Sequence, residues 1–179
     1  MSHTRNHTVL ISIVSPDQVG LVAAVTGRLF DLGVNLADTS FAVLGKGCEF
    51  SCVAELPADI SSRFLQSELQ SLECLAHADC LVTDFRFPVD QDSSSDVTHI
   101  IEVGGGDQPG LIARLAEAFI DYDANVVRMH STRRLGEDGK MTYHTTFAIS
   151  VAPERAEACI AAINNTAGQL QLTCRDQKV

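Results

Sequence analysis

The segment Asp17-Gln18-Val19-Gly20-Leu21 occurs a second time, with one substitution, as Asp107-Gln108-Pro109-Gly110-Leu111. A shift of 90 residues, which moves position 17 onto position 107, aligns these segments and the chain around them. Over residues 17–40 the shift gives seven identities, at Asp17, Gln18, Gly20, Leu21, Ala23, Asp31 and Asn35. The period is too long for a solenoid repeat, so the sequence indicates two copies of one domain-sized module.

Residue spacing predicts the order β-α-β-β-α-β for the first copy. The segment 8–14 is rich in β-branched residues and places Val9, Ile11 and Ile13 on one face, which is typical of a half-buried strand. Apolar residues then recur with helical spacing in 20–32. We predict strands at 8–14, 35–44, 48–56 and 80–87, helices at 20–32 and 59–75, and a hairpin turn at Gly45-Lys46-Gly47.

The second predicted helix of this copy, 59–75, is expected to begin at Asp59, whose carboxylate would act as the N-cap. Five apolar side chains of this segment are expected to face the core, namely Ile60, Phe64, Leu65, Leu69 and Leu72.

The second copy repeats the order. We predict strands at 97–103, 125–134, 141–151 and 169–174 and helices at 110–122 and 153–164. Two split βαβ units of this size predict an α+β fold, a ferredoxin-like antiparallel sheet with helices on one face. The segment 89–96 has no periodicity and is expected to be a linker between domains 1–88 and 97–179.

Composition excludes several classes of function. The chain has 179 residues, of which 45% are hydrophobic, and a formal net charge of −10. A packed core is therefore expected, and direct binding to nucleic acid or to an anionic membrane is not. There is no apolar run of membrane-spanning length and no signal-peptide pattern, so we expect a cytoplasmic protein. The six cysteines form no CxxC pair and are expected to be free thiols.

The repeated turn could bind a small zwitterion. It ends at a helix N-terminus, where unpaired N–H groups and the helix dipole favour a carboxylate, and Gly20 and Gly110 have no Cβ to keep a ligand away. Asp17 and Asp107 could meet an α-ammonium group, and the amides of Asn35 and Asn125 could both donate and accept. Each of these residues also has a purely structural interpretation as a helix cap, a turn glycine or a loop residue.

Other motifs predict no metal site, no cofactor and no catalytic centre. The run Gly104-Gly105-Gly106 precedes the second turn but lacks the spacing of a dinucleotide-binding loop, and we interpret it as slack for the approach of a ligand. Cys48 and Cys52 share a strand face with apolar residues and are expected to pack in the core. His99 is expected to be half-buried, and His130 and His144 to lie near each other on adjacent strands without a third metal ligand.

The segment 15–23, followed by Gly33-Val34-Asn35-Leu36, resembles an ACT domain, a small regulatory module. The second copy is similar and keeps the Pro109-Gly110 pair, where the first has Val19 before its glycine. A bare tandem of this kind resembles the glycine cleavage system transcriptional repressor family. The first copy also resembles the N-terminal segment of formyltetrahydrofolate deformylases, whose catalytic domain the chain is not expected to contain.

The resemblance implies that the chain is not an enzyme and binds a small amino acid, with glycine favoured. It assigns ligand contacts to the turn and to the strand-initial asparagine, often from a paired domain, which here are Asp17, Gly20, Asn35, Asp107, Gly110 and Asn125. The expected partner is a protein, either a transcription factor or an enzyme, and the chain is expected to form a homo-oligomer.

Three hypotheses remain open from the sequence. The first is a regulator that acts through a DNA-binding partner, since no basic stripe is present. The second is a regulatory subunit that acts in trans on an enzyme of amino-acid metabolism. The third is a degenerate pair that binds no ligand and serves as a scaffold. In each case the two modules are expected to pair within the chain, because the edge strands of a four-stranded sheet expose unpaired N–H and C=O groups that a second module can cover.

Overall fold

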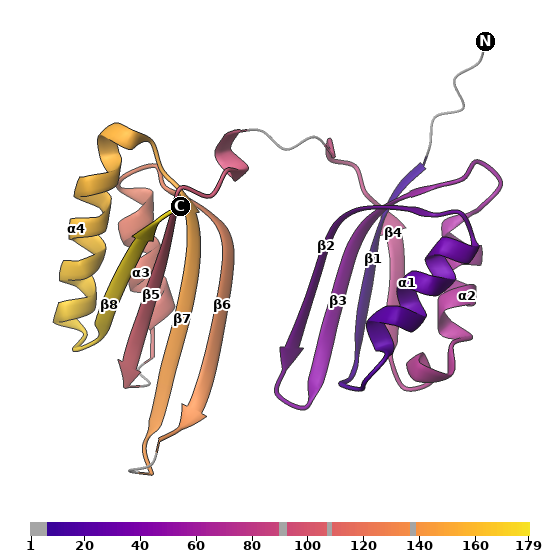
Figure 1. Ribbon diagram of the computed structural model, residues 1–179, viewed down its shortest axis with the longest axis horizontal. Coiled ribbons are helices and arrows are strands. Elements are labelled where there is room, and N and C mark those ends of the chain that lie inside the picture. The colour runs from indigo at the N-terminus through magenta and orange to yellow at the C-terminus, as the bar shows by residue number, and fades with distance from the viewer. Residues whose placement is uncertain (1–6, 90–92, 107–108, 137–138) are drawn as a thin grey trace. The chain divides into compact units, whose positions relative to one another are not determined.

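The computed structural model describes residues 7–89, 93–106, 109–136 and 139–179, which form two compact units divided between Val89 and Asp90 (Figure 1). The first unit contains β1 (His7–Pro16), α1 (Leu21–Asp31), β2 (Asn35–Leu44), β3 (Gly47–Leu56), α2 (Ser62–Gln70), a 3-10 turn (Glu73–Leu75) and β4 (Asp79–Asp84). The second contains a 3-10 turn (Ser93–Ser95), β5 (His99–Gly106), α3 (Leu111–Ile120), β6 (Asn125–Leu135), β7 (Met141–Ser150), α4 (Pro153–Gln169) and β8 (Thr173–Lys178).

Both units have the predicted topology. The first sheet has the strand order β2-β3-β1-β4 and the second has β6-β7-β5-β8, and every neighbouring pair is antiparallel. The helices of each unit cover one face of its sheet (Figure 1). The prediction of two ferredoxin-like βαββαβ modules in tandem is therefore confirmed. None of the helices in the described ranges is long and apolar enough to span a membrane.

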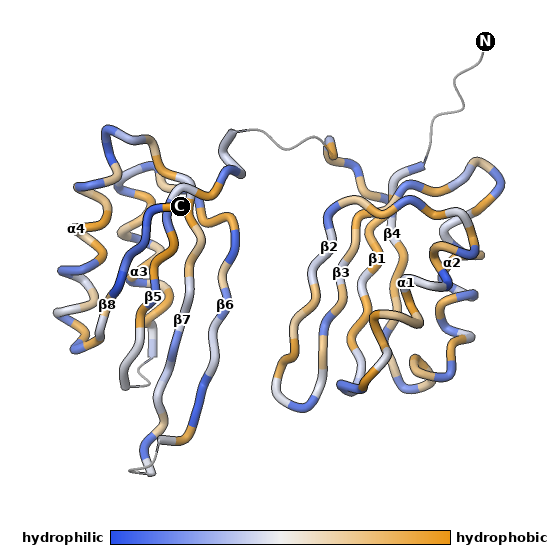
Figure 2. The backbone as a smooth tube through the Cα atoms, viewed as in Figure 1, coloured by the Kyte–Doolittle hydropathy of each residue, from blue (hydrophilic) through white to orange (hydrophobic). Residues whose placement is uncertain are grey.

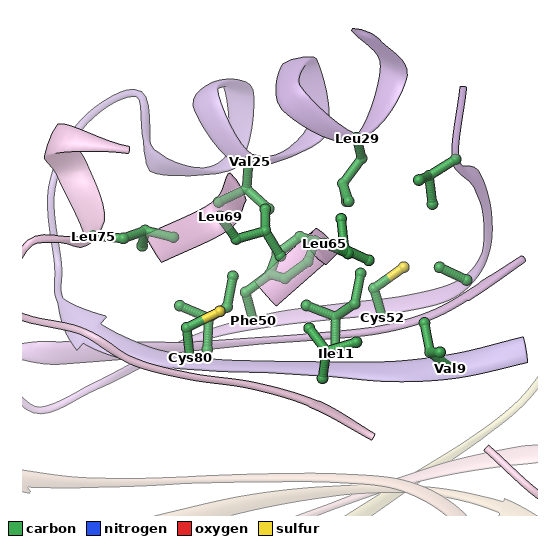
Figure 3. Packing of buried hydrophobic residues seen from close by; sticks show 14 of the residues in the cluster. Val9, Ile11, Val25, Leu29, Phe50, Cys52, Leu65, Leu69, Leu75 and Cys80 are labelled. Atoms are coloured by element: carbon green, nitrogen blue, oxygen red, sulfur yellow. The ribbon is translucent and has the colours of Figure 1, made fainter. Parts of the chain in front are cut away.

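The core of the first unit lies between its sheet and its two helices. The alternating residues Val9, Ile11 and Ile13 of β1 are buried, as predicted. Figure 3 shows Val25 and Leu29 of α1 and Leu65 and Leu69 of α2 directed toward Phe50 and the strands. A separate cluster, centred on Leu115, Phe119 and Phe147, forms the core of the second unit. Each unit therefore has a hydrophobic core of its own.

The predicted start of the second helix is wrong. The helix α2 begins at Ser62, and Ser61, not Asp59, is its N-cap: the Ser61 hydroxyl accepts a hydrogen bond from the Phe64 backbone N–H at 3.2 Å. With this start, Leu65 and Leu69 face the core, whereas the Phe64 side chain is 46% exposed. Phe64 precedes Leu65 by one residue, about 100° around the helix, and so lies at the border of the apolar face.

Replacing Ser61 with alanine is expected to lower the free energy of unfolding of the first unit by about 1 kcal/mol, because one N–H group of the first turn loses its acceptor. The matched control is Asp59→Ala, which is expected to change that free energy by less than about 0.5 kcal/mol, since Asp59 caps nothing. Urea denaturation of the two variants checks this. A larger loss of stability for Asp59→Ala than for Ser61→Ala would contradict Ser61 as the N-cap and support Asp59, the N-cap predicted from the sequence.

The end of the second unit also differs from the prediction. The helix α4 continues to Gln169 and the last strand spans Thr173–Lys178, whereas the sequence predicted a helix end at 164 and a strand at 169–174. The helix buries three residues at helical spacing, namely Cys159, Ile163 and Ala167. Because the burial continues to Ala167, the polar residues 164–166 stay helical. The chain turns only at Gln171, which has a positive φ of 57°.

The glycine run before the second turn is part of β5. Gly104 pairs with His144 and Gly105 with Tyr143. A Cβ at Gly104 would lie 2.7 Å from His144 Nδ1, and one at Gly105 would lie 2.6 Å from Leu172 Cδ2. These two glycines therefore make room for neighbouring side chains of the second unit, and the interpretation as slack for a ligand is wrong for them.

Candidate functional site

The turn between β1 and α1 is held by its own unit. The Asp17 backbone N–H donates to the Lys46 carbonyl oxygen at 3.1 Å, and the Gln18 side-chain amide donates to the Cys74 carbonyl oxygen at 2.7 Å. Gly20 is the N-cap residue of α1 with a φ of 91°, which is a left-handed conformation that suits glycine. The turn is therefore fixed at one end by the β2–β3 hairpin and at the other by the 3-10 turn after α2.

The N-terminus of α1 is open to a ligand. Among the described residues no side chain caps it, and its first turn contains no acidic residue. A hollow of about 520 Å³ lies beside it, lined by residues 17–23 and by Phe41 of β2. A Cβ added at Gly20 would have no other atom within 4 Å, so the backbone there is accessible. A carboxylate in this hollow could accept from the N–H groups of the first turn.

The asparagine of the same unit lies far from this hollow. Asn35 is exposed at the start of β2 and stands opposite Glu55 of β3, which pairs with Thr8 of β1. The turn follows Pro16, at the other end of β1. Eight residues of strand separate the two positions by roughly 25 Å. Asp17 and Gly20 therefore lie together, and Asn35 of the same unit does not join them.

The second unit repeats this separation. Gly110 is the N-cap residue of α3 with a φ of 81°, and no described side chain caps that helix. Asn125 begins β6 opposite Ser150, at the end of the sheet where β5 begins, whereas Gly110 follows the other end of β5. Asp107 lies outside the described residues. In both units, a site that uses the turn and the asparagine together needs residues from two modules.

Asn125 also has a structural partner. Its side-chain amide donates to the Ser94 carbonyl oxygen at 2.9 Å. The Ser150 hydroxyl contributes a second hydrogen bond to this segment, to the Ser93 carbonyl oxygen at 3.4 Å. The amide of Asn125 therefore holds the 3-10 turn that precedes β5, a role that was not foreseen from the sequence.

Two residues of the first site were also missed. Gln18 anchors the turn and Phe41 forms a wall of the hollow. The repeat did include Gln18, but nothing in the sequence shows which carbonyl its amide reaches. Phe41 is 42% exposed on the edge strand β2, and its cross-strand partner is Phe50 of β3. A large apolar residue in a strand predicts burial, so the sequence alone would place Phe41 in the core.

Burial lowers the reactivity of four of the six cysteines. All six are free thiols, and Cys48 and Cys52 are buried in the core, as predicted. Desolvation by burial raises the pKa of the Cys52, Cys80, Cys159 and Cys174 thiols. A raised pKa keeps each of these groups in its neutral, weakly nucleophilic form near neutral pH.

The histidines form no metal site within the described ranges. His99 is buried, and its Nδ1 atom lies 3.0 Å from the Thr98 hydroxyl. His130 stands opposite Thr146 and His144 opposite Thr132, so the two histidines are diagonal neighbours on one face of the sheet. No group of three His, Cys, Asp or Glu side chains in this part of the chain could hold a metal ion.

Residues 7–78 match the ACT domain family model. No curated protein matches the chain at significant sequence similarity. A crystal structure of an unknown protein from Galdieria sulphuraria is similar over 98% of this chain and 99% of its own, with a TM-score of 0.75 and 16% identity. A structure described as a "putative glycine cleavage system transcriptional repressor" is similar over 98% of each chain, with a TM-score of 0.69 and 14% identity.

At these identities the two structural likenesses show the fold of the whole chain, and the family model matches its first module. Both modules have the same strand order and the same glycine at the N-cap of their first helix. The chain is a tandem of two ferredoxin-like βαββαβ modules, of which the first matches the ACT domain family model over residues 7–78.

Proposed function

We propose that the chain is a non-enzymatic, cytoplasmic regulatory protein that binds a small amino acid and alters the activity of a partner protein. The observation that carries this proposal is the uncapped N-terminus of α1, with Gly20 at a φ of 91°, beside a hollow of about 520 Å³ in an ACT module. The hollow has room for an amino acid.

The ligand contacts follow from the charges around the hollow. The N–H groups at the start of α1 would bind the carboxylate, and the exposed Asp17 side chain would pair with the ammonium group. The amide of Asn35 or Asn125 would be contributed by a second module, because each unit separates its own turn from its own asparagine. Gly110, and Asp107 by analogy with Asp17, would form the corresponding turn of the second module.

A ligand shared by two modules provides a mechanism of regulation. If it binds more tightly when two modules are paired than when they are apart, it shifts the population toward the paired state. The partner that reads this shift would be a transcription factor or an enzyme of amino-acid metabolism. With a net charge of −10, the chain would act on transcription through such a partner and not through its own contact with DNA.

Glycine is the ligand that we favour. The support is the structural likeness to the protein described as a glycine cleavage repressor, together with the resemblance seen in the sequence. The hollow is wide enough for larger side chains, so its size does not select glycine by itself. Repression of glycine cleavage genes through a DNA-binding partner is the corresponding biological role.

A thermal-shift screen of the twenty amino acids tests the proposal. A ligand at 100 times its dissociation constant is expected to stabilise the folded chain by about 2.7 kcal/mol, with glycine among the active compounds. Glycinamide and acetate, which each lack one charge of the zwitterion, are the controls and should give a much smaller shift. A screen without any shift at millimolar concentrations contradicts the proposal and leaves the scaffold hypothesis.

A further inference from the structure

Each sheet has one face that none of the described helices covers, which we call its open face (Figure 1). In the second unit, Ile101 and Val103 of β5 point into the core, so their neighbour Glu102 lies on the open face. Its cross-strand partner on β8 is Arg175. By the same alternation Arg128, His130, Arg134 and His144 lie on this face, from β6 and β7.

The open face of the second unit carries an excess of positive charge. Arg128, Arg134 and Arg175 are exposed there against a single carboxylate, that of Glu102. The ion pairs of the described residues join His7 to Asp84, Arg28 to Glu68 and Arg155 to Asp123, and none uses these three arginines. The face also contains a hollow of about 670 Å³, between His144 and Arg175. In Figure 2 the strand β8 is drawn as hydrophilic.

The open face of the first unit has the opposite charge. It carries Glu49 and Glu55 of β3 and Asp79 of β4, and its four strands contain no lysine or arginine. Val14 of β1 lies between Glu49 and Asp79 on this face and is 55% exposed, as is Leu81 of β4. The face therefore combines carboxylates with exposed apolar side chains.

The internal repeat places residues of different character at equivalent positions of the two open faces. Glu49 stands opposite Val14, and His144 opposite Gly104, which is 90 residues after Val14. Likewise Leu81 stands opposite Ser12, and Arg175 opposite Glu102. The core-facing positions Ile11 and Ile101 have kept the same residue. The two modules therefore have similar core residues, each in its own core, but open faces of opposite charge, an arrangement typical of complementary binding surfaces.

We propose that the open face of the second unit binds the open face of the first unit of another copy of the chain. The reverse contact forms at the same time, so two copies close into a twofold dimer with two equivalent contacts. An open face four strands wide measures about 20 Å by 25 Å. Two such faces give on the order of 1,000 Å² per chain, above the roughly 800 Å² per partner of a standard interface.

Sedimentation velocity of the full chain tests this proposal. A dimer is expected at low salt, and its dissociation constant is expected to rise with ionic strength because the contacts are between exposed charges. The double variant Arg128→Glu/Arg175→Glu is expected to raise that constant at least about 100-fold, since it places like charges opposite each other. Arg63→Glu/Arg114→Glu makes the same change of charge on exposed helix positions and should leave it within about threefold of the parent.

A charge exchange separates a direct contact from an indirect effect. Adding Glu49→Arg and Asp79→Arg to the Arg128→Glu/Arg175→Glu variant is expected to lower the dissociation constant of that variant at least tenfold. A chain that stays monomeric at low salt overturns the proposal, as does a dimer that the arginine variant leaves unchanged. A variant weakened without recovery on charge exchange overturns the assignment of the first unit as the partner. The open faces do not include the turn at Gly20, so none of these outcomes decides the amino-acid site.

Discussion

Replacing Phe50 with alanine is expected to lower the free energy of unfolding of the first unit by about 3–5 kcal/mol, which is the usual effect of removing a buried aromatic ring. The Phe50 side chain is 1% exposed and lies on β3, between Ile13 of β1 and Phe41 of β2. Figure 3 shows it beneath the helices, near Leu65 and Leu69. A loss of this size is a large fraction of the stability of a small domain. Urea denaturation monitored by circular dichroism measures it.

The matched control is Phe41→Ala, which removes the same ring from the neighbouring strand. The Phe41 side chain is 42% exposed, so its removal opens no closed cavity, and we expect a loss below about 1.5 kcal/mol. Because the second unit has a core of its own around Phe119 and Phe147, its unfolding should not respond to either variant. Equal losses for the two phenylalanines would contradict the burial of Phe50, and not of Phe41, in this core.

The sequence predicted most of the strands well, though not the last one, because alternation is a local property. Apolar residues at alternate positions, such as Val9, Ile11 and Ile13, indicate a strand with one buried face. The repeat of the segment at Asp17 and Asp107 also allows the prediction for one module to be compared with that for the other. Prediction from local residue spacing was wrong where polar residues and buried apolar residues occur in the same segment. At the end of α4 the polar residues 164–166 suggest a loop, yet burial of Ile163 and Ala167 keeps the segment helical.

The candidate site was only partly predictable, for a reason of topology. The sequence identified the turn and the asparagines, but whether they meet depends on the strand register. Because β1 and β2 are parallel to each other across β3, the start of β2 lies at the opposite end of the sheet from the turn. A local pattern also could not show that the Asn125 amide reaches the Ser94 carbonyl oxygen, 31 residues earlier.

Replacing Asn35 with alanine is expected to weaken binding of the tightest amino acid from the screen by about 10- to 150-fold. This is the effect of losing one hydrogen bond to a charged group, about 1.5–3 kcal/mol. Asn35 is exposed on an edge strand, and its side chain makes no hydrogen bond with the described residues, so the fold should be unchanged. Calorimetric titration of the variant measures the affinity.

The appropriate control is Asn164→Ala, which removes an amide that donates to the Ile160 carbonyl oxygen within α4 and should not alter the affinity. Asn125→Ala is expected to weaken binding as well, but it also releases the Ser94 carbonyl oxygen, so protease sensitivity near residues 93–95 should rise even without ligand. Asn35 is therefore the better probe of the site, because its replacement is expected to change ligand affinity without changing the local structure. If both variants stay folded and bind with the affinity of the parent, the strand-initial asparagines are not part of the site.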